Sequence, residues 1–380
     1  MDIEIEADKS IKADVLVETK KLQKSFRRFD IIFFLICALV GVDTISSAAK
    51  NGAQGFTWLI FLAVAFFVPY GLIIAELGST FTGEGGCYLW TKYAFGYPAA
   101  AITAIFYWIS VPIWVGGSLL ISALAASDAF FAPMQGVWRY VFALAFIWFT
   151  IVSAILSFRV GKWIPNVGAW ARFLVLSFFT FSVGLYASKH GVHGFVGHDF
   201  LPTYALFITV APVLVYNYVG FELPNSAGDE MTNPQKDVPF AVAMSAIGAI
   251  LLYGIPILAI LLVLPQERVT GLGGFIDALK AVFTVYGGHV GKDAVTLTGW
   301  GQVLGGAAAI LFILSLVSSG TTWLMGGDRV LAVAGYTGAA PRILGRFSSR
   351  LGTPIVANIL SGIFATIVML VAFQDRKSVV

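Results

Sequence analysis

Charge is scarce in this chain. Asp, Glu, Lys and Arg together make up 12% of the 380 residues, whereas hydrophobic residues make up 58%. So few charges cannot cover the surface of a soluble domain of this length. The composition therefore excludes a soluble globular protein and favours an all-α integral membrane protein.

Cysteine and histidine are also rare. Cys37 falls in an apolar run and Cys87 in a loop, so we expect no structural disulfide. The four histidines (His190, His193, His198 and His289) all fall in loops. We interpret them as solvated side chains, and a metal site at the first three is the weaker alternative. We therefore expect no metal.

Motifs for chemistry and for nucleotides are missing too. A membrane-embedded enzyme needs clustered intramembrane histidines, carboxylates or a nucleophile with its base, and the apolar runs contain no histidine. No Gly-x-x-x-x-Gly-Lys-Ser/Thr loop is present to bind phosphates. The net charge of +3 does not call for nucleic acid. We expect neither an enzyme nor a cofactor.

What the sequence does contain is a series of apolar runs long enough to cross a bilayer as helices. We predict nine transmembrane helices. Their predicted ranges are 31–49, 58–75, 98–127, 140–158, 173–188, 200–221, 238–266, 300–326 and 353–373.

Basic residues give an orientation for this multi-pass protein. With a cytoplasmic N-terminus, sixteen of the 24 Lys and Arg residues fall on the inner side, as the positive-inside rule favours for a cell-membrane protein. Residues 1–30 are then a cytoplasmic tail, disordered or lying along the membrane surface. They do not resemble a cleavable signal peptide. In the outer loop, the apolar spacing of 275–283 predicts a short amphipathic helix.

Two similar stretches, Val40-Gly41-Val42-Asp43 and Val219-Gly220-Phe221-Glu222, place a glycine and a carboxylate inside the first and sixth spans. A charge at the bilayer centre costs about 2.5–3.5 kcal/mol, so such residues usually face a cavity or a partner. Paired interruptions at matching places in two halves are typical of a transporter's binding site.

The spacing of these stretches predicts an inverted repeat. Five spans separate their starts, so the first and sixth helices cross the membrane in opposite directions. We predict a first repeat over 31–188, a second and incomplete repeat over 200–373, and a short C-terminal end at 374–380.

The glycines let the backbone leave helical geometry and free its N–H and C=O groups. Gly41 and Gly220 are therefore candidate backbone binding positions, with close helix packing as the alternative. Asp43 is a candidate to pair with a substrate ammonium or to take up a proton; the alternative is a hydrated residue near the outer end of its span. Val42 and Thr44 beside it complete the substrate-binding set in this span.

Three separated motifs resemble the amino acid–polyamine–organocation permeases. They are Glu76-Leu77-Gly78-Ser79 through Gly96, Phe221-Glu222 through Pro239, and Asp328-Arg329 through Gly352-Thr353-Pro354. The resemblance implies a leucine-transporter-like fold, usually of twelve spans, so the chain is expected to be truncated after the ninth. Gly55-Phe56-Thr57-Trp58 and Glu84-Gly85-Gly86 are loosely similar to the glutamate/γ-aminobutyrate exchanger branch.

The resemblance also implies roles. Glu222 matches an acidic proton-coupling or gating position, with hydrogen bonding to free backbone amides as the alternative. Tyr216 matches an aromatic that closes over substrate, and Asn217 follows it with hydrogen-bonding groups. Arg172 lies where related transporters bind sodium, so its fixed charge argues against sodium dependence; a side chain that snorkels to the inner surface is the alternative.

Other candidates line the expected cavity more weakly. Ser315, Ser318 and Ser319 of the eighth span are expected to face the first and fifth spans, with helix packing as the alternative. Trp108 and Trp114 flank Pro112 in the third span, with interface or lipid-facing roles equally open.

The resemblance implies a secondary active transporter that moves amino acids or related amines by alternating access, coupled to protons or to exchange. The alternative is a transporter-like sensor or a non-functional truncated permease. The family's first span is typically broken by a Gly-small-Gly stretch. Val42-Asp43 after Gly41 departs from it, which favours an unusual substrate such as a γ-amino acid or a polyamine.

Overall fold

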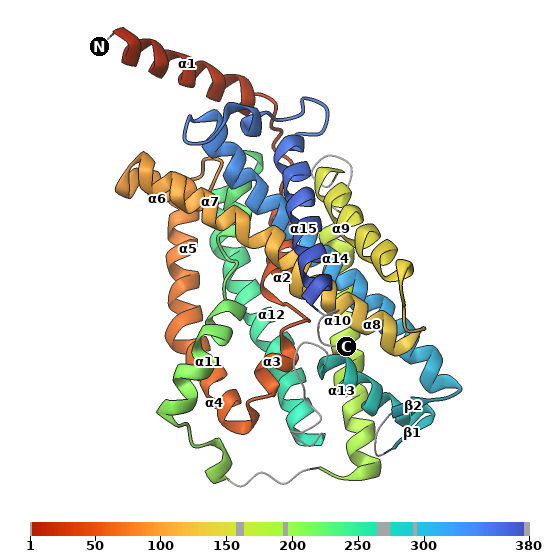
Figure 1. The fold of residues 1–380 in the computed structure, drawn as a ribbon. Helices are drawn as coiled ribbons and strands as arrows, with labels where there is room; N and C mark the ends of the chain where they lie inside the picture. The colour runs from red at the N-terminus through yellow and green to blue at the C-terminus, as the bar shows by residue number, and fades with distance from the viewer. Residues whose placement is uncertain (1, 157–162, 193–196, 264–273, 292–294, 376–380) are drawn as a thin grey trace.

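The computed structural model describes residues 2–156, 163–192, 197–263, 274–291 and 295–375. Helices dominate the described chain and pack side by side as an elongated bundle (Figure 1). The membrane-length helices are built from α4 (Gly52–Leu62), η1 (Ala63–Phe67), α5 (Val68–Thr80), α7 (Tyr97–Trp114), η2 (Val115–Leu119), α8 (Leu120–Phe130), α9 (Val137–Leu156), α10 (Trp163–His190), α12 (Pro234–Val263), α14 (Trp300–Tyr336) and α15 (Ile355–Asp375).

Seven helices in the described ranges are long and apolar enough to cross a membrane. They correspond to the second to fifth and seventh to ninth predicted spans, which confirms a multi-pass helical membrane protein. The bounds are Gly52–Thr80, Tyr97–Phe130, Val137–Leu156, Ile164–His190, Pro234–Val263, Trp300–Tyr336 and Ile355–Gln374.

The first and sixth predicted spans are the two that are not continuous helices. The first consists of α2 (Arg28–Leu39) and α3 (Ile45–Ala49), separated by non-helical residues, and the sixth consists of α11 (Tyr204–Asn217) and the 3₁₀ turns of η4 (Leu223–Glu230). The interruptions predicted from the two glycine–carboxylate stretches are therefore present. The sequence count of nine spans depends on whether these two broken segments also cross.

The two broken segments run antiparallel. α2, the first half of one, contacts η4, the second half of the other, and α3 likewise contacts α11. The long helix α14 packs against α2, α7, α9 and α10, and 61% of its most apolar window is buried. It is therefore a central helix of the bundle and lies next to both broken segments (Figure 1).

The N-terminal region is ordered against one end of the bundle. α1 (Asp2–Thr19) is a helix, and Glu18 accepts a 2.8 Å hydrogen bond from the backbone N–H of Phe347. The amides of Ser25 and Phe26 both bond to the carbonyl of Glu230 at 2.9 Å. Specific backbone and carboxylate partners thus hold the segment from Glu18 to Phe26 against the bundle.

The same end carries α6 (Cys87–Phe95) and the 3₁₀ turn η7 (Arg342–Gly345). At the opposite end lie η3 (Gly197–Phe200), α13 (Gly274–Phe283), η6 (Thr284–Tyr286) and an antiparallel hairpin of β1 (Gly288–Val290) with β2 (Val295–Leu297). The predicted outer-loop helix is confirmed as α13, although most of its side chains are buried. The hairpin has no counterpart in the sequence prediction.

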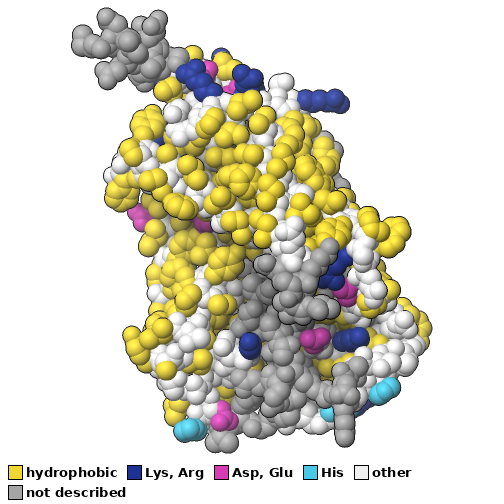
Figure 2. Space-filling view, viewed as in Figure 1, with side chains coloured by type: hydrophobic (Ala, Val, Ile, Leu, Met, Phe, Trp, Pro, Cys, Tyr) yellow, Lys and Arg dark blue, Asp and Glu magenta, His cyan; other side chains and the backbone are white. Residues whose placement is uncertain are grey.

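The surface fits this arrangement. Hydrophobic side chains cover much of the visible face, and Lys and Arg gather at the end where α1 and η7 lie (Figure 2). Exposed apolar residues such as Phe106, Phe149 and Ile247 lie on the long helices, as expected where lipid is the solvent.

Candidate functional site

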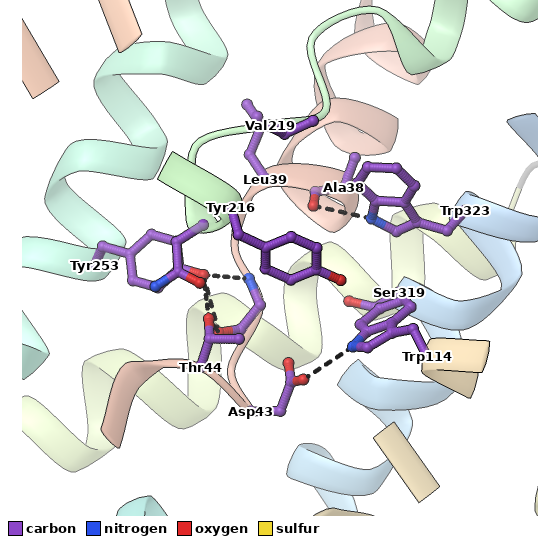
Figure 3. Close-up of a pocket in the computed structure, with 12 residues that line it drawn as sticks. Ala38, Leu39, Asp43, Thr44, Trp114, Tyr216, Val219, Tyr253, Ser319 and Trp323 are labelled. Carbon is purple, nitrogen blue, oxygen red and sulfur yellow. Dashed lines mark hydrogen bonds between the residues drawn. The ribbon is translucent and has the colours of Figure 1, made fainter. Parts of the chain in front are cut away.

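A pocket lies where the two broken segments meet. Its empty volume is about 330 Å³, which includes the space at its opening to solvent. Residues from both breaks and from α7, α12 and α14 line it (Figure 3). They are Ala38, Leu39, Gly41, Asp43, Thr44, Trp114, Tyr216, Asn217, Val219, Tyr253, Ser319 and Trp323.

Among the described residues that line the pocket, Asp43 is the only one with an acidic or basic side chain. Its side chain is 1% exposed, and Oδ2 accepts a 3.3 Å hydrogen bond from Trp114 Nε1. The other oxygen, Oδ1, is buried without a hydrogen-bond partner in the structure. An unpaired buried carboxylate oxygen is costly, so this atom is a candidate to receive a ligand.

The break at Gly41 is closed by protein groups. The Gly41 N–H donates to Tyr253 Oη at 2.9 Å, and Tyr253 Oη approaches the Gly41 carbonyl at 3.1 Å. Thr44 Oγ1 donates to the same carbonyl at 2.9 Å and lies 2.7 Å from Tyr253 Oη. The tyrosine hydroxyl thus satisfies backbone groups that the helix leaves unpaired.

Asn217 lies at the C-terminal end of α11, on the other broken segment. Its side chain is 5% exposed, yet neither the amide oxygen nor the amide nitrogen has a partner in the structure. The neighbouring Tyr216 is 57% exposed, and its ring extends across the pocket (Figure 3). Asn217 therefore offers the pocket a buried hydrogen-bond donor and a buried acceptor, next in the chain to the exposed Tyr216.

Two tryptophans, Trp114 and Trp323, also line the pocket. The rings of Trp114 and Trp323 lie 6.3 Å apart at 70°. Trp323 Nε1 donates to the Ala38 carbonyl at the end of α2, at 3.2 Å. Both indole N–H groups are thus engaged, so each tryptophan is held in place and leaves its ring to contact a ligand.

Glu222 lies below the second break and outside the lining. Tyr107 Oη donates to its Oε1 at 2.8 Å, and Tyr70 Oη donates to its Oε2. The side chain is 7% exposed. Tyr70 also accepts a 3.4 Å hydrogen bond from the Gly220 amide, whose φ of +139° is one that glycine adopts readily. The carboxylate is held by tyrosines, and not by the backbone amides considered as the alternative.

Arg172 on α10 is fully buried. Nη2 donates to the Ser315 carbonyl at 2.7 Å and to Ser319 Oγ, and Nη1 donates to Cys37 Sγ at 3.0 Å and to the Gly168 carbonyl at 3.3 Å. The snorkelling alternative is wrong, because these acceptors on α2, α10 and α14 hold the guanidinium inside the bundle.

Ser318 and Trp108 lie outside the pocket. Ser318 Oγ donates to Cys37 Sγ at 3.2 Å. Trp108 Nε1 donates to Ser361 Oγ at 2.8 Å and to Asp328 Oδ1 at 3.1 Å. Asp328 also accepts a 2.5 Å hydrogen bond from Ser361. Trp108 thus belongs to a polar cluster that ties α7 to α14 and α15.

A second buried charge cluster closes the end of the bundle near α1. Arg329 pairs with Glu84 and, at 3.2 Å, with Glu230, and it donates to the Gly352 carbonyl at 2.8 Å. Burial raises the pKa of Glu84 from its ordinary value of 4.5 to about 8; the Arg329 charge opposes the rise, and the Glu230 charge adds to it. Glu84 and Glu230 thus both contact the Arg329 guanidinium.

The structure thus brings seven predicted residues to the pocket: Gly41, Asp43, Thr44, Trp114, Tyr216, Asn217 and Ser319. It places seven others elsewhere: Val42, Gly220, Glu222, Arg172, Trp108, Ser315 and Ser318. Of these, Val42 is fully buried. The sequence analysis missed two lining residues, Tyr253 and Trp323. Each is an aromatic residue with a hydrogen-bonding group inside an apolar span, and that feature could have identified them.

No group of three or more His, Cys, Asp or Glu residues in the described ranges could hold a metal ion. His190 and His198 are exposed, and His193 lies outside the described residues. Cys37 and Cys87 are both free thiols.

Comparison with known proteins places these features in a family. The family model described as "Amino acid permease" matches residues 26–379. A Lactococcus lactis protein named "Probable agmatine/putrescine antiporter AguD" is 27% identical over 352 residues, which cover 92% of this chain and 72% of that protein.

Two further matches are more distant. A Lactococcus lactis glutamate/gamma-aminobutyrate antiporter is 22% identical over 328 residues, covering 82% of this chain and 61% of that protein. Among solved structures, the inward-facing conformation of Mhp1 matches with a TM-score of 0.49 and 14% identity, covering 93% of this chain and 71% of that one.

Proposed function

This chain belongs to the amino acid permease family, and we propose that it is a secondary active transporter that moves an amino acid or a related amine across the membrane by alternating access. The observation that carries the proposal is the pocket between the two broken segments, where Asp43 Oδ1 and the Asn217 side-chain amide are buried without partners. Buried polar atoms normally have partners, so these atoms fit a ligand that comes and goes.

The antiparallel broken segments support alternating access. Their backbone breaks lie beside the pocket, where rocking of one helix set against another exposes a central site to either side in turn. We propose that residues 31–188 and 200–373 are the two inverted repeats, with the sixth and first spans crossing in opposite directions. The N-terminus is assigned to the cytoplasm, since the basic end of the bundle carries α1 and η7.

Glu222 and Arg172 are the candidates for coupling. Glu222 is a buried carboxylate held by Tyr70 and Tyr107 at the second break, which suits a coupling or gating position. Arg172 holds a permanent charge between α2, α10 and α14, which suits a transporter without a sodium requirement. Two of the related proteins are named antiporters, which favours exchange.

The proposal is tested by exchange in proteoliposomes. Vesicles loaded with unlabelled putrescine, ornithine, glutamate or γ-aminobutyrate are diluted into the matching radiolabelled compound, in sodium-free potassium buffer, with and without an imposed proton gradient. Saturable uptake that requires a loaded internal substrate supports the proposal. Folded, inserted protein that moves none of these or the common amino acids would overturn it.

A matched pair of variants connects uptake to the pocket. Asp43→Asn removes the one acidic side chain of the described lining, whereas Asp277→Asn removes a carboxylate from α13, outside the lining. We expect Asp43→Asn to lose uptake and Asp277→Asn to keep it.

A further inference from the structure

The Gly41 amide, at the backbone break beside the pocket, is not free to bind a carboxylate. A carboxylate bound at a helix break needs free N–H donors, and the Gly41 N–H already donates to Tyr253 Oη at 2.9 Å. Thr44 directs its hydroxyl proton to the Gly41 carbonyl. The tyrosine hydroxyl therefore occupies the position that an anionic oxygen would otherwise take.

The charges point the same way. Of the described residues, no Lys, Arg or His lines the pocket, and Asp43 is the one acidic residue that does. Arg172 is not in the lining, although it contacts the lining residue Ser319. Its Nη groups donate to Ser319 Oγ and to other acceptors on the protein. A ligand carboxylate near Asp43 would lie beside another carboxylate. Among the described lining residues, the Asn217 amide nitrogen is the one side-chain donor without a partner that could bind it.

A cation finds several partners in the same space. Asp43 Oδ1 and Asn217 Oδ1 are buried acceptors without partners. The faces of Trp114, Trp323 and Tyr216 border the cavity (Figure 3), and aromatic faces attract ammonium and guanidinium groups. Each of these groups favours positive charge and none requires a carboxylate on the ligand.

We propose that this pocket selects cationic amines that lack a carboxylate, and that Tyr253 is the residue that excludes the carboxylate. The inference rests on the proposed function, because it names the substrate class of the same site. It narrows that class from amino acids and amines to ammonium or guanidinium compounds without an acid group.

Binding to the purified protein tests the inference separately from transport. Isothermal titration in detergent compares putrescine with ornithine and agmatine with arginine, two pairs that differ only in the α-carboxylate. We expect the carboxylate-free member of each pair to bind about tenfold more tightly or better, because the α-carboxylate would be buried without a cationic partner. Equal or tighter binding of ornithine and arginine, or no binding by any of the four, overturns the inference.

Tyr253→Phe tests the role of the hydroxyl. The variant frees the Gly41 N–H to bind a carboxylate, so the affinity for ornithine should rise relative to that for putrescine. The ratio of the two dissociation constants should change by about fivefold, the value of one modest hydrogen bond. Tyr218→Phe is the matched control, because Tyr218 Oη donates to the Leu59 carbonyl away from the pocket. An unchanged preference in Tyr253→Phe would overturn the role of Tyr253, and an equal change in Tyr218→Phe would do the same.

Asp43→Asn adds a test that does not depend on Tyr253. It should weaken putrescine and agmatine more than the corresponding amino acids. Failure of the proposed function has a different signature: amines bind with this preference, yet no exchange occurs in proteoliposomes.

Discussion

Tyr107 on α7 donates a 2.8 Å hydrogen bond to Glu222 at the second helix break. This contact joins a continuous helix to the segment that must rearrange if the pocket is to open inward. Tyr70 on α5 holds the other oxygen of the same carboxylate. Two continuous helices are thus fastened to the sixth segment through one side chain.

We expect Tyr107→Phe to change transport more than binding. Its loss leaves a buried carboxylate oxygen without its donor, a change that costs about 1–3 kcal/mol, or roughly 5- to 150-fold in a rate that depends on the contact. Initial exchange rates and equilibrium binding of putrescine are measured for each protein. Tyr93→Phe is the control, because Tyr93 is 63% exposed on α6.

Glu222→Gln extends this prediction. If Glu222 couples transport to protons, exchange by the variant should no longer respond to an imposed proton gradient. A wild-type response to the gradient in Glu222→Gln would contradict the coupling role.

Arg172 should be required for stability and should make transport independent of sodium. Arg172→Gln removes a buried charge that donates to acceptors on three helices. We expect a cost of about 2–4 kcal/mol, which lowers Tm by roughly 5–10 °C. Tm is read by intrinsic fluorescence in detergent, with Arg139→Gln, at a half-buried residue near the N-terminal end of α9, as the control.

The sodium part is measured on the wild-type protein. Uptake in potassium buffer should equal uptake in sodium buffer. A strict sodium requirement would contradict the assignment of Arg172 to a sodium-replacing role.

Much of the architecture was predictable because lipid imposes a simple pattern on sequence. Apolar runs such as 238–266 and 353–373 match α12 and α15 closely, since a spanning helix must satisfy its own backbone and present apolar side chains. The breaks were also predictable, because a glycine beside a carboxylate in such a run disfavours a continuous helix.

The pocket lining was harder to predict because it depends on helix rotation. Trp108 and Trp114 looked equivalent in sequence, yet only Trp114 lines the pocket. Six residues at about 100° each turn a helix by about 600°, so the two rings point about 120° apart. Tyr253 was missed for a related reason: its role comes from Gly41, 212 residues away, and no local pattern records that contact.

The first turn of α2 should restrain the end of the bundle that carries α1. Arg28 Nε pairs with Asp237 Oδ1 at 2.8 Å, which ties the start of α2 to the start of α12. Arg28 is 44% exposed, so the pair is worth at most about 1 kcal/mol. We expect Arg28→Ala to raise the rate of Cys87 alkylation by roughly two- to fivefold.

Cys87 is a natural reporter for this test, because Cys37 is fully buried. Alkylation at each site is followed by mass spectrometry of the intact detergent-solubilised protein. Arg346→Ala, in the loop after η7, serves as the control. No change in Cys87 reactivity in Arg28→Ala would show that the ion pair does not restrain opening at this end.

Glu84 should make stability fall as pH rises. Its pKa is raised by burial to about 8 in the folded protein, against an ordinary value of 4.5. The folded state therefore binds more protons than the unfolded state between these values, and the contribution is fully present below pH 4.5 and lost as pH rises through about 8. We expect Tm in detergent to decline across this window.

Glu84→Gln separates this contribution from other titrating groups. The amide cannot ionise, so the variant should show a flatter dependence of Tm on pH, whatever its absolute Tm. Glu76→Gln, at an exposed position near the end of α5, should keep the wild-type slope. A wild-type slope in Glu84→Gln would mean that Glu84 stays ionised beside Arg329, and that the ion pair outweighs the cost of burial.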